Sequence, residues 1–190
     1  MQEIIIYQII SLRTPPTSAA SFTRVDSLTV LGVTFNSKLC FDLHASNIID
    51  KAARALYGLK TIRSHGLTGE SLHDVTRATL IARLIYAAPA WWGFVSLAET
   101  DRIQSVIKKA KRYGHLPRNF PDVSCLVDAL ETNLFNSIMC NSNHVLHQLM
   151  PPEKINSLTC GNVPTTFTIP LIHNNMLRKN FLYRLLFRDM

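Results

Sequence analysis

The spacing of the apolar residues restricts the possible folds of this chain more than any other feature. In the middle of the chain this spacing follows the period of an α-helix over several long stretches. From about Leu43 to Ser64, apolar side chains recur every third or fourth residue, which places them along one face of an amphipathic helix. Gly66 follows as a favourable helix end. The sequence therefore predicts a long helix that packs through Ile48, Ala52, Leu56, Leu59 and Ile62.

Two more helices with clear start signals are expected before residue 115. Thr68 is a suitable capping residue for the first, and Pro89 is expected to end or kink that helix. Ser96 and Glu99 form a capping box at the start of the second, which Gly114 closes. Their apolar faces comprise Leu72, Val75, Leu80 and Leu84 in the first helix, and Ile103, Val106, Ile107 and Ala110 in the second.

The C-terminal third carries weaker signals. A fourth helix is expected from about Asn133 to Leu149, where two prolines, Pro151 and Pro152, stop it. Residues 156–170 are polar and poorly patterned. Residues 174–189 alternate basic with aromatic or aliphatic side chains, which favours a last amphipathic helix docked on the core over the alternative of a nucleic-acid-binding tail.

Only the first 40 or so residues indicate β structure. Residues 4–10 (IIIYQII) are β-branched and apolar, as in a strand, and residues 25–35 alternate around Gly32, as in a bulge or hairpin. We therefore expect a mainly α fold in three parts. These are a short β segment over 1–40, a helical bundle over 41–150 and a tail with a last helix over 151–190.

Charge and composition restrict the class of partner. The net charge is +7, which favours anionic partners, nucleic acid first. Four scattered cysteines do not form a disulfide framework, and the N-terminus lacks signal-peptide features, so we expect an intracellular protein, nuclear or cytoplasmic and not secreted. The uncharged run from Leu84 to Ala98 is too short for a membrane span and contains Pro89, so it is expected to be core.

The third expected helix carries the clearest candidate binding surface. Lys108, Lys109, Lys111 and Arg112 fall on the side opposite its apolar face, and Arg102 lies earlier on the same helix. Long flexible cations of this kind bind phosphates and displace counterions without recognising sequence. A solvated surface is the alternative interpretation. A second basic set on the first helix flanks its apolar stripe, where it can simply cover the edge of the core: Lys51, Arg54, Lys60 and Arg63.

Other candidate clusters are weaker. Cys140, His144 and His147 would share one face of the fourth helix, but an ordinary polar face is favoured over a zinc site. Trp91 and Trp92 are expected to pack in the core rather than to stack on bases.

Catalytic patterns are missing from the sequence. Two-metal nucleotidyl transfer needs carboxylates held close together, and no two of the aspartates are adjacent. No phosphate-binding loop, nucleophile elbow or zinc-protease motif occurs either. We therefore assign no catalytic residue, no metal ligand and no cofactor.

Several blocks of the sequence resemble jockey-like, LINE-type non-LTR retrotransposon reverse transcriptases. The similarity is best over 26–110, and its most specific part is Tyr86–Trp91 (YAAPAW) followed by Arg102–Gln104 and Ile107–Ala110. Other matching positions are Leu31–Phe35, Leu39, His44, Ile48, Lys51–Ala52, Leu56–Tyr57, Leu59, Gly66–Leu67, Arg178, Asn180–Phe181 and Leu186–Phe187.

This resemblance implies a C-terminal, thumb-side fragment of such a polymerase. Leu31, Gly32 and Val33 would lie at the primer-grip edge of the palm, and the helices would form the thumb that holds the template–primer duplex. The fingers, most of the palm and the paired aspartates have no counterpart here.

The expected function is therefore non-catalytic. We expect weak, phosphate-mediated binding of an RNA–DNA or DNA duplex, with the missing palm and fingers as a further partner and no membrane role. The alternatives are a host helical module that binds a protein, and a pseudogene product without function.

Overall fold

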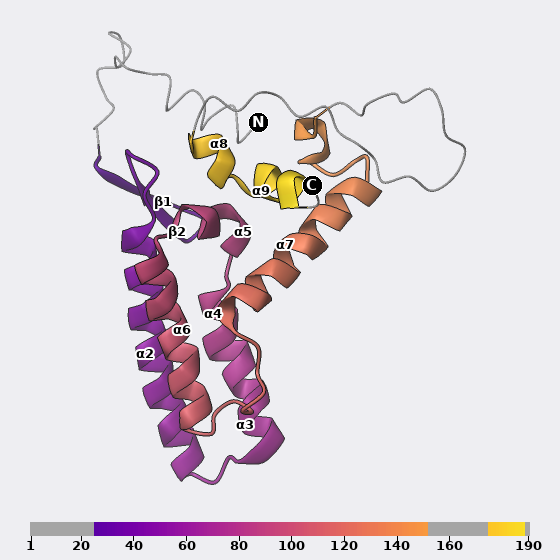
Figure 1. Cartoon of the computed structure of the whole chain (residues 1–190). Helices are drawn as coiled ribbons and strands as arrows, with labels where there is room; N and C mark the ends of the chain where they lie inside the picture. The colour runs from indigo at the N-terminus through magenta and orange to yellow at the C-terminus, as the bar shows by residue number, and fades with distance from the viewer. Residues whose placement is uncertain (1–24, 152–174, 189–190) are drawn as a thin grey trace.

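The computed structural model describes residues 25–151 and 175–188, and this part of the chain is mainly helical with one two-stranded antiparallel sheet (Figure 1). The predicted strand over residues 4–10 lies outside the described residues, as does much of the predicted tail. The elements are β1 (Ser27–Val30), β2 (Val33–Asn36), α2 (Asp42–Ser64), α3 (Gly69–Thr76), η1 (Arg77–Ile81), α4 (Ala82–Leu84), α5 (Ala88–Trp91), η2 (Trp92–Phe94), α6 (Leu97–Arg112), α7 (Val123–Cys140), η3 (His147–Leu149), α8 (Asn175–Lys179) and α9 (Phe181–Arg188).

The interrupted strand expected over 25–35 is a β-hairpin. Leu31 and Gly32 form its two-residue turn with φ values of 49° and 83°, the left-handed geometry that matches the twist of paired strands. Tyr86, just before α5, donates from its hydroxyl to the Leu31 carbonyl oxygen at 3.1 Å. The hairpin is thus fixed to the helices at its tip.

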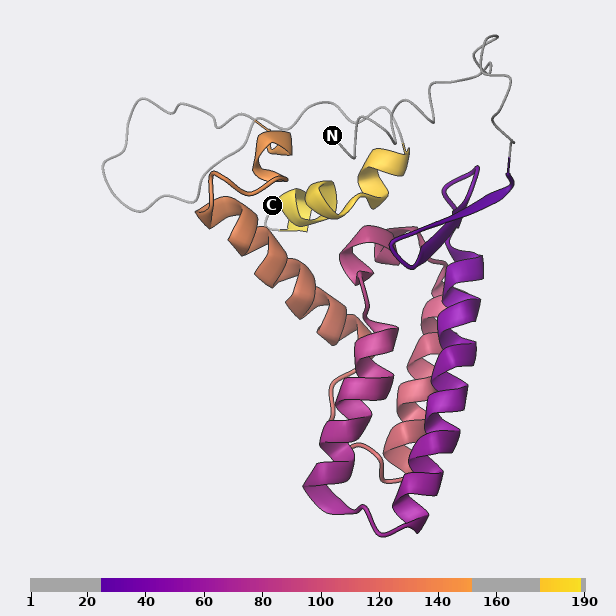
Figure 2. The same cartoon turned by 180° about the vertical axis from the view of Figure 1, so that it is seen from behind.

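Three helical segments form an elongated bundle below the hairpin. α2 and α6 run in the same direction, and α3, η1 and α4 return antiparallel beside them (Figures 1 and 2). Most residues of the predicted faces point inward: Ile48, Ala52 and Leu59 on α2 pack in one core with Leu72, Leu80, Leu84, Ile103, Val106, Ile107 and Ala110. Ile62, which was also expected to pack, is instead 41% exposed near the end of α2. Removal of this apolar surface from water is the main force that holds the bundle together.

The second expected helix is not regular. A π-helical turn, η1, interrupts it, and the hydroxyls of Thr76 and Thr79 donate back to the carbonyls of Leu72 and Val75, at 2.7 Å each. The expectation that Pro89 ends this helix was wrong. The helix ends at Leu84, before the left-handed Ala87, and Pro89 instead occupies the first turn of α5, where its missing N–H costs nothing.

The fourth helix was predicted in the wrong place. α7 begins at Val123 and ends at Cys140, about ten residues earlier than expected at each end. Asp122 takes the N-cap position. Because the helix stops at Cys140, that residue does not share a helix face with His144 and His147.

The C-terminal helix α9 packs against α7, and α8 and α9 lie above α5 (Figure 2). A second apolar cluster joins Ile138 of α7 to Phe181, Leu182 and Leu185 of α9, as expected for an amphipathic last helix docked on the core. Beside it, Arg184 is ion-paired with Glu131, whose side chain is 1% exposed. We call the region of α7, α8, α9 and Gly93 that surrounds this ion pair the C-terminal junction.

The run from Leu84 to Ala98, expected to be core rather than membrane, is buried only in part, since Tyr86 and Leu97 are 54% and 85% exposed. Leu84, Ala88 and Trp91 are fully enclosed, and Trp91 Nε1 donates to the Tyr86 carbonyl oxygen at 2.9 Å. Within the described residues, no helix is both long enough and apolar enough to cross a membrane.

Candidate nucleic-acid interface

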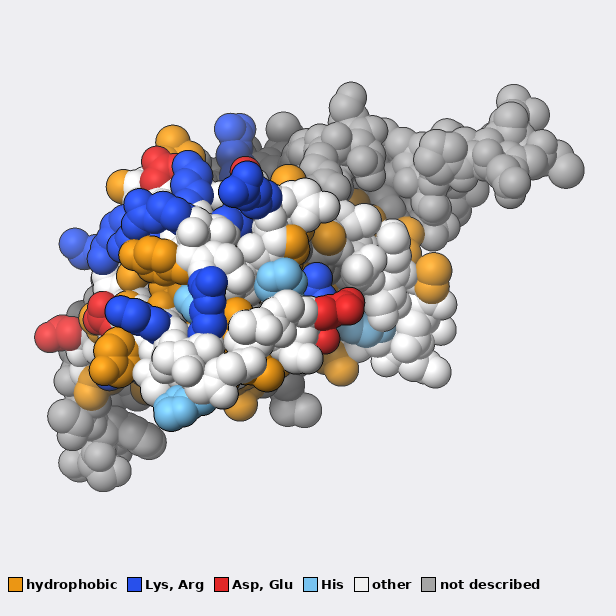
Figure 3. All heavy atoms as spheres, turned by 90° about the horizontal axis from the view of Figure 1, so that it is seen from below, with side chains coloured by type: hydrophobic (Ala, Val, Ile, Leu, Met, Phe, Trp, Pro, Cys, Tyr) orange, Lys and Arg blue, Asp and Glu red, His pale blue; other side chains and the backbone are white. Residues whose placement is uncertain are grey.

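The C-terminal ends of α2 and α6 lie together at the far end of the bundle and bring cations from both helices into one region. Arg63 of α2 donates from Nη1 to the carbonyl oxygen of Tyr113, the residue that ends α6. Seen from this end, lysine and arginine side chains gather on one side of the molecule (Figure 3). We call this region the basic end and define it by Lys60, Arg63, Lys108, Lys109 and Arg112.

The predicted basic residues of α6 fall into two groups, those with an acidic partner and those without one among the described residues. Lys108 and Lys109 are exposed and have no ion-pair partner among the described residues. Lys111 is 20% exposed and contacts Asp122 at 3.3 Å. Arg102 lies near the opposite end of α6 and binds Glu99 at 2.7 Å. Only part of the predicted set therefore remains available for an external anion.

Asp122, the acidic partner of Lys111 at the start of α7, is itself held in place by hydrogen bonds from α6. The hydrogen bond from Lys111, and then the one from Gln104, lower the pKa of Asp122 below its usual value. Its carboxylate accepts from Gln104 Nε2 at 2.6 Å. Lys111 is thus a structural cation between α6 and α7 rather than a free one.

Arg112 and Tyr113 form a cation–aromatic pair at the basic end. The Arg112 guanidinium carbon lies 5.2 Å from the centre of the Tyr113 ring, and Nη2 is 3.3 Å from the tyrosine hydroxyl. This hydrogen bond, with the charges of Arg112, Lys109 and Lys60, lowers the pKa of the Tyr113 hydroxyl. Arg112, Lys109 and Lys60 thus place positive charge around the ring.

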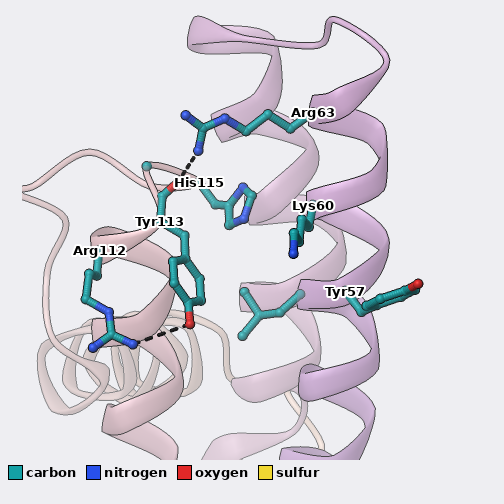
Figure 4. A pocket seen from close by; sticks show the side chains of 8 residues that line it. Tyr57, Lys60, Arg63, Arg112, Tyr113 and His115 are labelled. Carbon is teal, nitrogen blue, oxygen red and sulfur yellow. Dashed lines mark hydrogen bonds between the residues drawn. The ribbon is translucent and has the colours of Figure 1, made fainter.

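A hollow of about 610 Å³ opens between α2 and α6 at this end, and no acidic residue lines it. The side chains of Lys60, Tyr113 and His115 lie between the two helices, whereas Tyr57 points away from them (Figure 4). We call it the α2–α6 hollow, and its lining comprises Leu56, Tyr57, Lys60, Arg63, Arg112, Tyr113, Gly114 and His115.

A second hollow of about 580 Å³ adjoins the first through Arg112 and Gly114. Arg118 adds another cation to its wall, beside Lys111, which is already paired with Asp122, and no acidic side chain lines this hollow. Arg112 therefore stands between two cationic concavities.

His115 is the buried polar residue of the basic end. It is 2% exposed, its Nδ1 has no hydrogen-bond partner in the described part of the chain, and it lines the α2–α6 hollow. Burial, and secondly the charge of Arg63, lowers the pKa of its imidazole below the usual 6.5. The ring is therefore neutral at pH 7 and offers one nitrogen as a donor and the other as an acceptor.

The residues predicted for the primer-grip edge lie elsewhere. Leu31 and Gly32 form the hairpin turn, and Val33 begins β2 with its side chain buried. The hairpin sits at the start of α2, so these residues and the basic end occupy opposite ends of the bundle (Figure 1). No single site unites the two predicted groups.

Metal-ligand geometry is not assembled within the described residues, where no group of three His, Cys, Asp or Glu side chains could hold an ion. His144 Nδ1 accepts from the Leu146 backbone N–H at 3.1 Å, and His147 Nδ1 lies 2.9 Å from the Ile138 carbonyl oxygen. Both rings thus serve the turn that follows α7.

Sequence reasoning missed three residues of this interface: Tyr113, His115 and Arg118. The set on α2 that includes Lys60 and Arg63 was noticed but interpreted as edge cover. The available signal was Gly114, whose φ of 72° turns the chain back and buries His115 against the helices.

Comparisons with known protein families, curated proteins and solved structures gave no match. A functional assignment therefore depends on the chain's own residues.

Proposed function

We propose that this chain binds nucleic acid through the phosphate backbone, without recognising base sequence, and that the basic end makes the contact. The observation that carries the proposal is the gathering of Lys60, Arg63 and Arg112 from two helix ends around hollows that no acidic residue lines. Lys108 and Lys109 extend the same positive surface along α6. Cations that are not neutralised locally attract phosphates and release their counterions.

A second line of support is the resemblance of residues 26–110 to LINE-type reverse transcriptases. On that basis the chain corresponds to a thumb-side fragment, and an RNA–DNA or DNA duplex is its expected ligand. The palm and fingers of such a polymerase are a further expected partner, inside the cell. We infer that the chain has no polymerase activity by itself, and primer extension by the purified chain would contradict this.

A salt titration of duplex binding tests the proposal. We expect the logarithm of the association constant to fall linearly with the logarithm of salt concentration. Lys108→Ala with Lys109→Ala should reduce that slope by about 2 at most, because each lost phosphate contact removes about 0.9. Arg102→Ala is the matched control. Because Glu99 already neutralises this cation, its removal should change the slope much less.

Binding that responds neither to salt nor to the lysine substitutions would contradict the proposal. It would favour the rival function, recognition of a protein partner. One observation is compatible with that rival: the hairpin exposes apolar side chains, with Leu28 45% and Leu31 76% exposed.

A further inference from the structure

We propose that the α2–α6 hollow holds a nucleotide by a terminal phosphate, a phosphomonoester, with its base against Tyr113. This inference rests on the proposed function, because it names the part of a nucleic acid that the basic end holds most tightly. A phosphorylated strand end and a free nucleoside monophosphate share this chemistry, so the experiment below includes both.

The charge of the hollow suits a terminal phosphate better than an internal one. Three cationic side chains, Lys60, Arg63 and Arg112, line one opening, and no carboxylate lines it. A phosphomonoester carries a charge of about −1.5 to −2 at pH 7. An internal phosphodiester carries one negative charge, so it gains less from the same three cations.

The two arginines keep donors for a ligand. Arg63 uses Nη1 on the Tyr113 carbonyl, and Arg112 uses Nη2 on the Tyr113 hydroxyl. Each guanidinium has five N–H donors in all, so most are left for phosphate oxygens. Gly114 leaves space beside them, because even a Cβ at this position would lie 3.5 Å from Arg63 Nη1.

The hollow is also lined by a buried polar side chain. His115 lines it with a side chain that is 98% buried and an Nδ1 that lacks a partner in the described residues. A buried nitrogen without a partner is unfavourable, and because this atom is itself enclosed, a ligand in the hollow gains the contact only by a shift of the ring. The hollow therefore includes a buried polar side chain, unlike a patch of surface lysines.

The size and the aromatic wall indicate a nucleotide rather than phosphate alone. Small-molecule pockets measure about 300–1,000 Å³, and the hollow has about 610 Å³. The Tyr113 ring is half-exposed beside the cations and offers a surface for base stacking, which is tolerant of sequence. Leu56 adds an apolar side chain to the lining of the hollow.

The test compares two fluorescent single-stranded oligonucleotides that differ only in a 5′-phosphate or a 5′-hydroxyl. We expect the full-length chain to bind the phosphorylated strand about tenfold more tightly, which is the effect of one added charge-assisted contact. Lys60→Gln with Arg112→Gln should bring this ratio to about 1. Lys60→Arg with Arg112→Lys keeps the charges and should retain a ratio well above 1.

A control with the same change in net charge is Lys38→Gln with Lys51→Gln, two exposed cations outside the hollow. It should leave the ratio unchanged. Lys108→Ala with Lys109→Ala should weaken both strands equally. In competition, free deoxyadenosine monophosphate should displace the phosphorylated strand more effectively than inorganic phosphate, because only the nucleotide supplies a base. Circular dichroism of each variant checks that the helices remain folded.

The possible results separate the two proposals. Equal binding of both strands by the unaltered chain would overturn this inference and leave the proposed function intact. Binding of the free nucleotide without binding of either strand would support the hollow and contradict the proposed function. If neither the strands nor the nucleotide binds, both fail. A ratio that survives Lys60→Gln with Arg112→Gln, in a folded variant, would place the phosphate elsewhere and overturn the inference.

Discussion

The basic end and the C-terminal junction use arginine in opposite ways. At the junction, Arg184 of α9 meets the carboxylate of Glu131 of α7, whose side chain is 1% exposed, and the two charges offset each other within the protein. At the basic end, Arg63 and Arg112 meet a backbone carbonyl and a tyrosine, and no carboxylate lines the hollows beside them. The residue type therefore does not reveal the role of a cation. Its acidic neighbours decide whether it holds the fold or remains free for an anion.

The largest expected effect is the loss of the junction ion pair. Arg184→Ala removes the ion-pair partner of a buried carboxylate, and such a loss costs about 3–5 kcal/mol of folding free energy. Arg112→Ala should change stability by about 0.5 kcal/mol or less, because the side chain is exposed. Urea denaturation of both variants measures the difference. An equal loss of folding free energy in the two variants would contradict the distinction between the two regions.

Substitution of Gly93, at the C-terminal junction, should have the next largest effect. A Cβ on Gly93 would lie 2.1 Å from the Lys179 carbonyl oxygen and 2.7 Å from Arg184 Nε, so α8 and α9 would have to shift. We expect Gly93→Ala to destabilise the fold by about 1–3 kcal/mol. The control is Gly58→Ala within α2, where a Cβ meets nothing within 4 Å.

Gly58→Ala should stabilise the protein by about 0.5–1 kcal/mol, because alanine favours a helix more than glycine does. Thermal unfolding of the two variants should therefore shift in opposite directions. A Gly93→Ala protein as stable as the unaltered chain would show that α8 and α9 do not pack this closely.

Acidification should affect the basic end through its buried histidine. Burial lowers the pKa of His115, and likewise that of His44 near the hairpin, below the usual 6.5. The unfolded chain therefore takes up protons more readily than the folded one as pH falls through about 6.5. We expect stability to be complete above that pH and to decrease from pH 7.5 to pH 5.5.

Urea midpoints at these two pH values measure the decrease, and His115→Leu together with His44→Leu should reduce it. Asp122 does not contribute in this window, since its pKa is already lowered from 3.8. Midpoints that rise on acidification would contradict the buried, neutral state of the two rings.

The smallest effect is expected from Asp122→Asn, which tests whether a neighbouring acidic residue keeps a cation from binding an anion. Asp122→Asn keeps a favourable residue type at the N-cap position of α7, where the side chain makes no capping hydrogen bond, and removes the charge that holds Lys111. Stability should change by about 1 kcal/mol at most. The salt slope of duplex binding should steepen by up to about 1, as one more cation becomes available. An unchanged slope would indicate that Lys111 cannot reach a phosphate even when it is unpaired.

The helical part of the fold could be predicted, because periodicity and capping are local. The spacing of Ile48, Ala52 and Leu59 predicted α2 almost to the residue, and Ser96 accepts the expected hydrogen bond from the Glu99 N–H at 3.3 Å. The place of α7 was missed, because its apolar pattern is diffuse and its start depends on Asp122, Gln104 and α6, which lie apart in sequence.

The candidate interface was predicted only in part, for a related reason. Helical spacing placed Lys108 and Lys109 on the outside of α6 correctly, since each exposed position depends on its own helix alone. It could not reveal that Glu99 neutralises Arg102 or that Lys111 faces Asp122. Nor could it show that α2 and α6 end together, because that depends on packing between segments about 50 residues apart.

The amino-acid sequence by itself determined the class of fold, the inward faces of the helices and the excess of positive charge. These follow from the order of side chains along each helix and from composition. The tertiary structure alone decided which cations are cancelled and which are concentrated. Electrostatic interactions depend on distance in space, and the distance between Lys60 of α2 and Arg112 of α6 is set by packing rather than by their separation along the chain.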